Sequence, residues 1–360
     1  MRLALQLARR GWGRTSPNPM VGAVLVKRGR LLGWGWHRQA GLPHAEIEAL
    51  RHAQQRGARP AGGTLYVTLE PCSTHGRTPP CTQAIRDAGL KRVVVAALDP
   101  NPNHAGRGLG WLRRAGVEVA RSPLEEEACE LNEAFNHWIV RRTPWVVVKA
   151  AMTLDGKIAT PSGQSKWITS PAARRRAMHE RRGADAILVG VNTVLADDPA
   201  LTIRPAPASA RVRRIVLDAR ARTPLSAQLV TDEWAGKLTT VVVADSAPAR
   251  RVSALSRRVQ VWTAPALRGH IDLPWLLQQL GQEQVCRLLV EGGGEVNASF
   301  LLNGLAHRVL FFYAPRILGG ATAIKAVGGN GFLSLSDSLK LGVMRWRKLG
   351  PDLMLSARTG

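Results

Sequence analysis

The chain has 360 residues, a length typical of about two domains. Its 45% hydrophobic content excludes a mostly disordered chain, no apolar run approaches the roughly 18 residues of a membrane-spanning helix, and four cysteines are too few for a disulfide scaffold. The net charge of +24 would attract nucleic acid, anionic membrane or phosphorylated small molecules, but 41 scattered Arg residues supply most of it, and an Arg-rich composition explains it equally well. We expect a soluble cytoplasmic protein.

The first half of the chain alternates strand-like and helix-like segments. A basic helix begins the chain, and from Val21 an apolar strand, a glycine turn and a second strand follow, too early for a removable leader. A helix running to about Gln55 comes next, and further strands and helices are predicted over 64–69, 81–88, 92–98, 106–115 and 117–120. A long amphipathic helix is predicted over 124–142, and the domain boundary follows it because Pro144 disfavours helix in the residue before it.

The second half restarts with two strand-like runs that flank Asp155-Gly156, a dipeptide typical of a hairpin turn. The pattern then predicts, in order, a basic helix over 171–182, a strand over 184–190, a polar loop over 192–198, strands over 213–218 and 239–244, a Pro- and Arg-rich stretch over 247–258, a strand over 286–290, a glycine turn over 291–294, a helix to Leu302 and a strand over 307–315. Alternation of this kind predicts a second α/β domain.

Three residues of the first half form a candidate zinc site: His44, Cys72 and Cys81. One imidazole and two thiolates leave the fourth tetrahedral position open, as catalytic zinc sites require. Cys81 opens a predicted helix, where the positive end of the helix dipole favours a thiolate. Zinc lowers the pKa of a bound water to about 7, so a carboxylate that does not bind the metal must move the protons, and Glu46 fits that role.

Residues two apart, such as His44 and Glu46, do not share a face of a regular helix, so these two side chains can converge only at the N-terminal end of the helix. The H-x-E and Pro-Cys elements are typical of zinc nucleobase deaminases. Eight residues separate the two cysteines here instead of two, which argues against the tRNA and cytidine editing branch. The other two cysteines, Cys129 and Cys286, are interpreted as core residues.

These residues, with other strings, resemble the family of bifunctional riboflavin-biosynthesis enzymes that fuse a pyrimidine deaminase to a pyrimidine reductase. The matching strings are PNPMVG (17–22), HAE (44–46), LEPCSTHGRTPPC (69–81), DPNP (99–102), AGRG (105–108), TLDGKIAT (153–160), SKWITSPAARR (165–175), NTVLADDPALTIR (192–204), VEGGGEVNASFL (290–301) and APRILGG (314–320). They span nearly the whole chain in the family's order.

The resemblance implies an α/β fold with an N-terminal cytidine-deaminase-like three-layer domain over 1–142 and a C-terminal dihydrofolate-reductase-like domain over 143–360. The first domain would remove an amino group from 2,5-diamino-6-ribosylamino-4(3H)-pyrimidinone 5′-phosphate with Zn²⁺. The implied deaminase positions are the metal ligands His44, Cys72 and Cys81, the proton shuttle Glu46, and the substrate contacts Asn18, His37, Arg77 and Asn101. Thr74 stands where many family members carry His.

The second domain would reduce the ribosyl group of 5-amino-6-(5-phosphoribosylamino)uracil to ribityl with NADPH. The implied substrate positions are Ser165, Arg181, Leu201, Arg204 and Glu291. The implied cofactor positions are Ala151, Trp167, Thr193, Asp197, Gly293, Gly294, Glu295, Val296, Asn297, Ala298 and Ser299. Apart from the resemblance, the strand, the glycines 292–294 and the following helix would let backbone N–H groups approach a phosphate closely. Glycine-rich turns between a strand and a helix are, however, often structural and bind no ligand.

Two other functions are alternatives to a bifunctional deaminase and reductase. A zinc deaminase acting on nucleic acid would bind it through the +24 charge and use the second half as an RNA-binding module. Residues 149–204 instead resemble a reductase and contain no RNA-binding signature. A non-catalytic zinc scaffold leaves Glu46 unexplained. The expected partners are small phosphorylated pyrimidines, with no specific nucleic acid and no membrane, and a homo-oligomer stays open.

Overall fold

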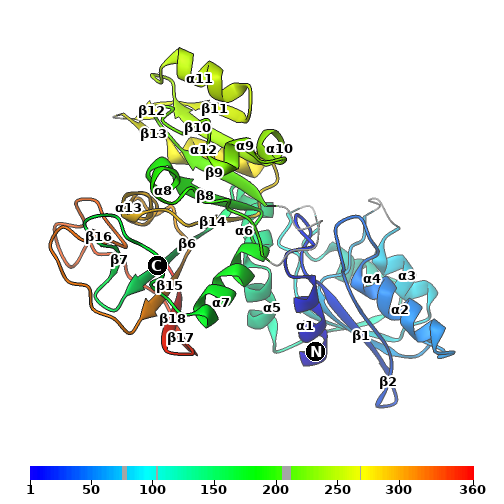
Figure 1. The fold of residues 1–360 in the computed structure, drawn as a ribbon. Coiled ribbons are helices and arrows are strands. Elements are labelled where there is room, and N and C mark those ends of the chain that lie inside the picture. Colours follow the sequence, from blue (N-terminus) through cyan, green and yellow to red (C-terminus); the bar gives the residue numbers. More distant parts are fainter. Residues whose placement is uncertain (75–78, 103, 205–211, 268) are drawn as a thin grey trace. The chain divides into compact units, whose positions relative to one another are not determined.

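The computed structural model describes residues 1–74, 79–102, 104–204, 212–267 and 269–360 (Figure 1). The chain divides into two compact units, Met1–Arg142 and Thr143–Gly360. Among the described residues, every helix is too short or too polar to cross a membrane.

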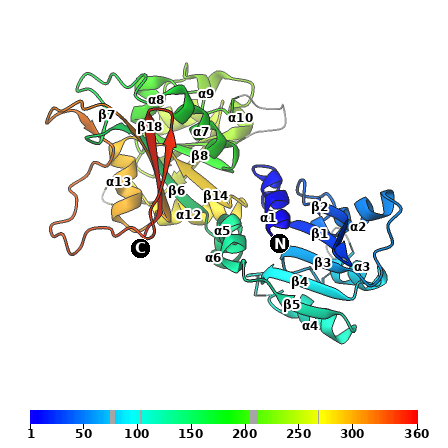
Figure 2. The same cartoon turned by 90° about the horizontal axis from the view of Figure 1, so that it is seen from below.

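The first unit is built on one five-stranded sheet. Its elements are α1 (Arg2–Ala8), the short 3₁₀ helix η1 (Arg9–Gly11), β1 (Gly22–Lys27), β2 (Arg30–Trp36), α2 (Ala45–Gln55), β3 (Thr64–Leu69), α3 (Cys81–Asp87), β4 (Arg92–Ala97), α4 (Arg107–Arg114), β5 (Glu118–Arg121), α5 (Glu125–Leu131) and α6 (Glu133–Arg141). The strand order is β2-β1-β3-β4-β5, in which β1 is antiparallel to both neighbours and β3, β4 and β5 are parallel (Figure 2).

Helices cover both faces of this sheet. Ala4 and Leu7 of α1 pack with Val24 on one face, whereas apolar residues of α2, α3 and α4 join the larger core on the other. Glycine in β2 lets α2 lie against the strand, because a Cβ on Gly33 would come 2.3 Å from the carbonyl oxygen of Ala49. This close approach fixes α2, whose N-terminal end carries His44 and Glu46.

The single helix predicted over 124–142 is wrong, because α5 ends at Leu131 and α6 begins at Glu133. The break lies at Asn132, whose backbone leaves the helical region with φ −111° and ψ 22°. Its side-chain amide is hydrogen-bonded to the backbone of Met20, 112 residues earlier in the chain. Amphipathic spacing continues across this position, so the interruption comes from a long-range polar contact.

The second unit is built on a nine-stranded sheet. Its elements are β6 (Trp145–Thr153), β7 (Lys157–Ala159), α7 (Pro171–Arg182), β8 (Ala186–Gly190), α8 (Val191–Asp197), β9 (Arg213–Leu217), α9 (Gln228–Thr231), α10 (Ala235–Leu238), β10 (Thr239–Ala244), α11 (Ala249–Ser256), β11 (Gln260–Ala264), β12 (Ala266–Leu267), β13 (His270–Ile271), α12 (Leu273–Gln282), β14 (Arg287–Val290), α13 (Gly294–Leu302), β15 (Arg308–Ala314), β16 (Ile324–Lys325), β17 (Arg345–Leu349) and β18 (Asp352–Arg358).

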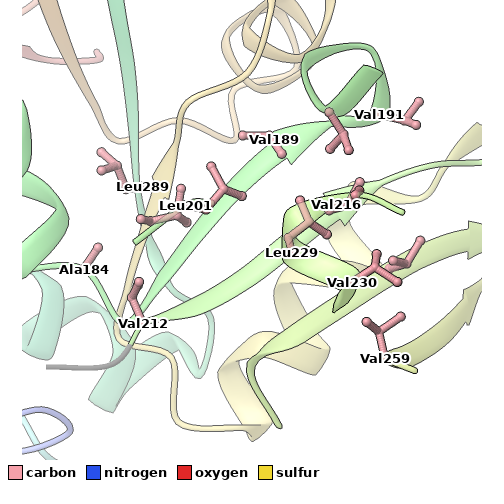
Figure 3. Packing of buried hydrophobic residues seen from close by; sticks show 14 of the residues in the cluster. Ala184, Val189, Val191, Leu201, Val212, Val216, Leu229, Val230, Val259 and Leu289 are labelled. Atoms are coloured by element: carbon pink, nitrogen blue, oxygen red, sulfur yellow. The ribbon is translucent and has the colours of Figure 1, made fainter. Parts of the chain in front are cut away.

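Seven of the nine strands are parallel. The order is β11-β10-β9-β8-β14-β6-β15-β18-β17. Every pair from β11 to β15 is parallel, and the last two pairs, β15 with β18 and β18 with β17, are antiparallel. Two hydrophobic clusters cover the two faces: α12 and α13 contribute to one, and α7 to α11 contribute to the other. Figure 3 shows part of the second cluster, where Val189, Val216 and Leu289 of neighbouring strands pack with Leu229.

Two local predictions in this unit are corrected by the structure, and one stretch for which no element was predicted contains a helix. The runs around Asp155-Gly156 form no hairpin, because the Asp155 carboxylate accepts hydrogen bonds from the backbone N–H of Leu318 and Gly319, and β7 pairs with β16 instead of β6. The polar loop predicted over 192–198 is helix α8, with Val191 and Val194 buried on its inner side. The Pro- and Arg-rich stretch over 247–258 contains helix α11.

Candidate functional site

The first unit brings together the three residues predicted to bind zinc. His44 is the N-cap residue of α2, Cys72 follows β3, and Cys81 is the first residue of α3. The Nδ1 atom of His44 lies 3.6 Å from Cys72 Sγ and 3.3 Å from Cys81 Sγ, and all three ligand atoms lie within 4.8 Å of one another. Ligands bound at 2.0–2.3 Å around one tetrahedral zinc would be separated by roughly 3.3–3.8 Å. The donor set and its spacing therefore fit a zinc ion.

The electrostatics of the two thiols also favour a cation between them. The Cys81 thiol and the His44 imidazole lower the pKa of the Cys72 thiol to about 4. That Cys72 thiolate, together with burial, raises the pKa of the Cys81 thiol. Both sulfurs ionise together only when a positive charge offsets their repulsion, and a bound metal ion supplies that charge.

Glu46 lies in the first turn of α2, beside the three ligands, and its side chain is buried. Burial raises the pKa of its carboxyl group to about 7, although the His44 imidazolium opposes the shift. A carboxyl group with a pKa close to neutral can both accept and return a proton at physiological pH. The N-terminal end of α2 therefore places a predicted metal ligand, His44, and a proton carrier, Glu46, next to each other.

Two of the predicted substrate contacts, Asn18 and His37, meet next to the ligands. The His37 ring is buried, burial lowers its pKa, and it stands edge-on to the His44 ring with 5.4 Å between centroids. In the neutral ring, Nδ1–H donates to the carbonyl oxygen of Pro43 at 3.1 Å, and Nε2 accepts from the Asn18 amide at 3.1 Å. The two side chains thus hold each other in place.

The loop residues 99–102 and 104–106 are anchored by Glu70, a residue of the LEPC string that is not among the predicted site residues. The buried Glu70 carboxylate accepts hydrogen bonds from the backbone N–H groups of Asp99, Gly106 and Leu109, at 3.3, 2.9 and 3.1 Å. Asn101 lies in this loop, and its N–H donates to the Asp99 carboxylate at 2.9 Å. The sequence did contain a signal for this role, because Glu70 is a charged residue between an apolar strand and the first cysteine of the predicted zinc site.

Two further positions border the same site. Thr74 Oγ1 lies 3.5 Å from His104 Nδ1, so an imidazole from another part of the chain lies beside position 74, where many family members carry His. The predicted substrate contact Arg77 lies outside the described residues.

In the second unit, the predicted positions gather where parallel strands end. Strands β8, β14 and β6 are neighbours, and their carboxyl ends meet at one edge of the sheet. Glu291 and the glycines 292–294 follow β14, Thr193 and Asp197 lie in α8 directly after β8, and Ala151 lies in the last third of β6. Crevices at such edges are where open α/β sheets bind ligands.

An ion cluster lies at this edge, and it contains one residue that sequence reasoning missed. Arg181 of α7 donates to both oxygens of Glu291, and the Lys149 ammonium of β6 lies 3.9 Å from Glu291 Oε2. Burial raises the pKa of Glu291, but Lys149 and Arg181 outweigh it and lower that pKa to about 2. The only lysine in the apolar run of β6 was a signal for Lys149.

Ser165 and Asp197 also meet, although they lie 32 residues apart. The Ser165 hydroxyl donates to Asp197 Oδ1 at 3.0 Å. Trp167 is 67% exposed, and the Arg174 guanidinium lies 4.6 Å from the centre of its ring. An exposed indole backed by a cation is a surface on which a flat ligand ring can stack.

The predicted cofactor segment over 293–299 begins α13, and its side chains divide between buried and exposed positions. Asn297 and Ala298 are buried, the Asn297 amide donates to the Ala326 carbonyl at 2.8 Å, and the Ser299 hydroxyl donates to the Glu295 carbonyl within the helix. A Cβ on Gly293 would meet nothing within 4 Å, whereas one on Gly294 would lie 2.4 Å from the Lys325 carbonyl oxygen. What the segment offers a ligand is mainly backbone at the start of α13.

Leu201 and Arg204 lie differently from the other predicted substrate positions. The Leu201 side chain is buried in the core with Val189 and Leu289, so its backbone is what remains for a ligand (Figure 3). The Arg204 side chain is exposed, at the end of a described stretch. Among the described contacts, neither Leu201 nor Arg204 forms a hydrogen bond or ion pair with Glu291 or Asp197.

Comparison with known proteins agrees with this geometry. Residues 144–355 match the family described as the RibD C-terminal domain, and residues 1–97 match the cytidine and deoxycytidylate deaminase zinc-binding region. The chain is 46% identical over 355 residues to the riboflavin biosynthesis protein RibD of Aquifex aeolicus, covering 99% of this chain and 96% of that protein. It is 40% identical over 364 residues to RibD of Escherichia coli, covering 99% and 97%.

Solved structures give the same result. Acinetobacter baumannii RibD superposes with a TM-score of 0.86 at 36% identity, covering 100% of this chain and 97% of that one. A Thermotoga maritima protein described as a diaminohydroxyphosphoribosylaminopyrimidine deaminase and 5-amino-6-(5-phosphoribosylamino)uracil reductase superposes with a TM-score of 0.84 at 34% identity, with the same coverage.

Proposed function

This chain belongs to the RibD family of bifunctional deaminases and reductases of riboflavin biosynthesis, and we propose that residues 1–142 are its deaminase domain and residues 143–360 its reductase domain. The first domain deaminates 2,5-diamino-6-ribosylamino-4(3H)-pyrimidinone 5′-phosphate, and the second reduces the ribosyl group of 5-amino-6-(5-phosphoribosylamino)uracil. The observation that carries this proposal is the convergence of His44, Cys72 and Cys81 beside the buried Glu46, in a chain whose other unit is a RibD C-terminal domain.

In the deaminase domain, His44, Cys72 and Cys81 would hold the zinc ion. When bound, zinc acts as a Lewis acid that makes a water molecule a better nucleophile. Glu46 carries the two protons of the attacking water in turn, one to the neighbouring ring nitrogen and one to the amino group, so that ammonia leaves and the ring carbon gains a carbonyl oxygen. Asn18 and His37, joined by their hydrogen bond, orient the pyrimidine ring, and Arg77 and Asn101 complete the substrate contacts.

In the reductase domain, the ion cluster around Glu291 would face the sugar. NADPH, when bound, supplies a hydride. Ionised Glu291 accepts hydrogen bonds from sugar hydroxyls, since Lys149 and Arg181 keep it charged. Reduction also needs a proton, and the Lys149 ammonium presents N–H donors at this cluster. Ser165, Leu201 and Arg204 would make further substrate contacts.

NADPH would be held by residues around the same sheet edge. Ala151, Thr193 and Asp197 lie near the ends of β6 and β8, Trp167 offers a stacking surface, and the 293–299 segment offers backbone at the start of α13. The exposed backbone at Gly293 and the positive end of the helix dipole suit a phosphate group.

The chain acts on small phosphorylated pyrimidines, and the +24 charge needs no nucleic-acid partner. Any charge of this size attracts polyanions at low salt, and the affinity should fall steeply as salt is added. A cytoplasmic location is also part of the proposal, because free thiolate ligands require a reducing compartment.

The test is to incubate the purified, zinc-loaded protein with the diaminopyrimidine phosphate, with and without NADPH. We expect ammonia release in both cases, and loss of NADPH absorbance that follows ammonia release in time. Ammonia release without any NADPH oxidation would overturn the reductase assignment, and NADPH oxidation that precedes ammonia release would overturn the order of the two steps.

A further inference from the structure

We infer that Asn132 is a positioning residue for deamination, because it holds from behind the segment that carries Asn18. This inference rests on the proposed deaminase function of the first unit. Asn132 lies in the joint between α5 and α6, outside every string that suggested the deaminase, and it touches none of the metal ligands or the proton shuttle in the described contacts.

The contact between Asn132 and Met20 is a complete amide pair. Asn132 Oδ1 accepts from the Met20 N–H at 2.8 Å, and Asn132 Nδ2 donates to the Met20 carbonyl oxygen at 2.9 Å. Both residues are buried, with 4% of Asn132 and 8% of Met20 exposed. A side-chain amide that binds both polar groups of one residue fixes the position and the orientation of that stretch of backbone.

Met20 needs such a partner because of its place in the chain. Strand β1 begins two residues later, at Gly22, so Met20 lies outside the strand ladder that would satisfy its N–H and carbonyl groups. A buried backbone group without a partner costs roughly 1–3 kcal/mol. Asn132 therefore supplies what a neighbouring strand would supply, and it does so at the entrance of β1.

The segment fixed in this way leads directly to the substrate contacts. Asn18 lies two residues before Met20, and its side chain is bonded to His37. The backbone of His37 is held by the residue that follows Met20, because the His37 N–H donates to the Val21 carbonyl at 2.8 Å. Release of Met20 should therefore loosen both Asn18 and His37. Glu46 and His44 on α2, Cys81 on α3 and Cys72 after β3 should keep their own anchors.

The test uses two variants and a matched control. Asn132→Ala removes both hydrogen bonds, whereas Asn132→Asp keeps the shape and one acceptor but cannot donate to Met20. The control is Asn136→Ala, because the Asn136 amide donates to the Cys129 carbonyl within the same joint. We expect both Asn132 variants to raise the KM of deamination roughly tenfold, with kcat changed less, one zinc per chain and normal reductase activity. Asn136→Ala should keep the wild-type KM.

A second measurement does not depend on activity. Hydrogen exchange of a peptide covering residues 17–22 should be faster in both Asn132 variants and unchanged in Asn136→Ala. A fall in zinc content and kcat together, at unchanged KM, would mean that Asn132 only supports folding and would overturn the inference. Unchanged KM and unchanged exchange in Asn132→Asp would do the same. A wild-type protein that releases no ammonia would instead overturn the proposed function, and the inference with it.

Discussion

Arg181 and Glu291 lie 110 residues apart and face each other through two parallel hydrogen bonds, from Nε to Oε1 at 2.9 Å and from Nη2 to Oε2 at 2.7 Å. Arg181 also donates to the Thr202 carbonyl at 3.1 Å. One guanidinium therefore ties helix α7, the end of β14 and the segment that contains Leu201 into a single arrangement. Only the planar five-donor group of arginine can make all three contacts at once.

Replacing Arg181 with Lys should lower reductase kcat/KM by at least about tenfold, because an ammonium cannot make the two-pronged contact to Glu291. Deamination and zinc content should stay at wild-type levels, since the change lies in the other unit. Steady-state kinetics with saturating NADPH checks this, with Arg175→Lys, an exposed position on the same helix, as the control. Equal reductase kinetics in the two variants would remove Arg181 from the site.

Replacing Cys81 with Ser should abolish stoichiometric zinc binding, because a hydroxyl does not ionise to serve as the third ligand. Ammonia release should disappear with the metal, whereas NADPH-dependent reduction of the deaminated substrate should continue. Metal analysis of the dialysed protein is the measurement, and Cys129→Ser, half-buried in the same unit, is the control. Full zinc occupancy in Cys81→Ser would show that the ligand set is wrong.

Replacing Glu46 with Gln should leave one zinc per chain and reduce deamination by roughly 100-fold or more, because the amide has nearly the shape of the carboxyl group but carries no proton between water and amine. Zinc analysis and ammonia release are measured on the same preparation. Deamination within a few-fold of wild type would identify some other residue as the proton carrier.

The acid stability of the second unit should depend on Glu180. Burial raises the pKa of this carboxyl group, but Arg287 and Arg176 outweigh it and lower that pKa from 4.5 to about 2. Because the folded pKa is the lower one, the ion pair stabilises the fold fully above about pH 4.5, and this stabilisation is lost as the pH falls toward 2. Its size is on the order of 3 kcal/mol.

Glu180→Gln should therefore lower the free energy of unfolding at pH 7 by several kcal/mol, since it leaves Arg287 buried with a weaker partner, and should flatten the loss of stability between pH 5 and pH 3. Urea unfolding followed across that pH range is the measurement. Glu283→Gln, which removes an exposed ion pair with Arg213, should change stability by less than about 1 kcal/mol at any pH. The same acid profile in both variants would contradict the assignment.

Several features followed from the sequence because they depend on neighbouring residues. Proline before His44 and Cys81 marked two helix starts, and a residue at a helix start has a backbone position that its local sequence largely determines. With Cys72 at the end of a buried strand, the ligands and Glu46 could be named before any contact was known. The strands of the first sheet, and β6, β8, β9, β10, β14 and β15 of the second, followed in the same way from their apolar runs, whereas β11, β17 and β18 were not predicted.

Other features depended on residues far apart in the chain, and only the tertiary structure decided them. The pattern over 124–142 reads as one helix, but the Met20 backbone captures the Asn132 amide and divides it. Asp155-Gly156 reads as a hairpin, but its carboxylate binds the backbone at 318–319 and directs β7 to another partner.

The ion pair between Lys149 and Glu291 also could not be predicted from neighbouring residues, because it requires β6 and β14 to be adjacent in the sheet. A sequence reports on hydrogen bonds and packing within about one turn of helix or two residues of strand. Buried polar groups instead take whichever partner the completed fold brings within hydrogen-bonding or ion-pairing distance, since leaving them unpaired costs more than bending a helix or giving up a hairpin.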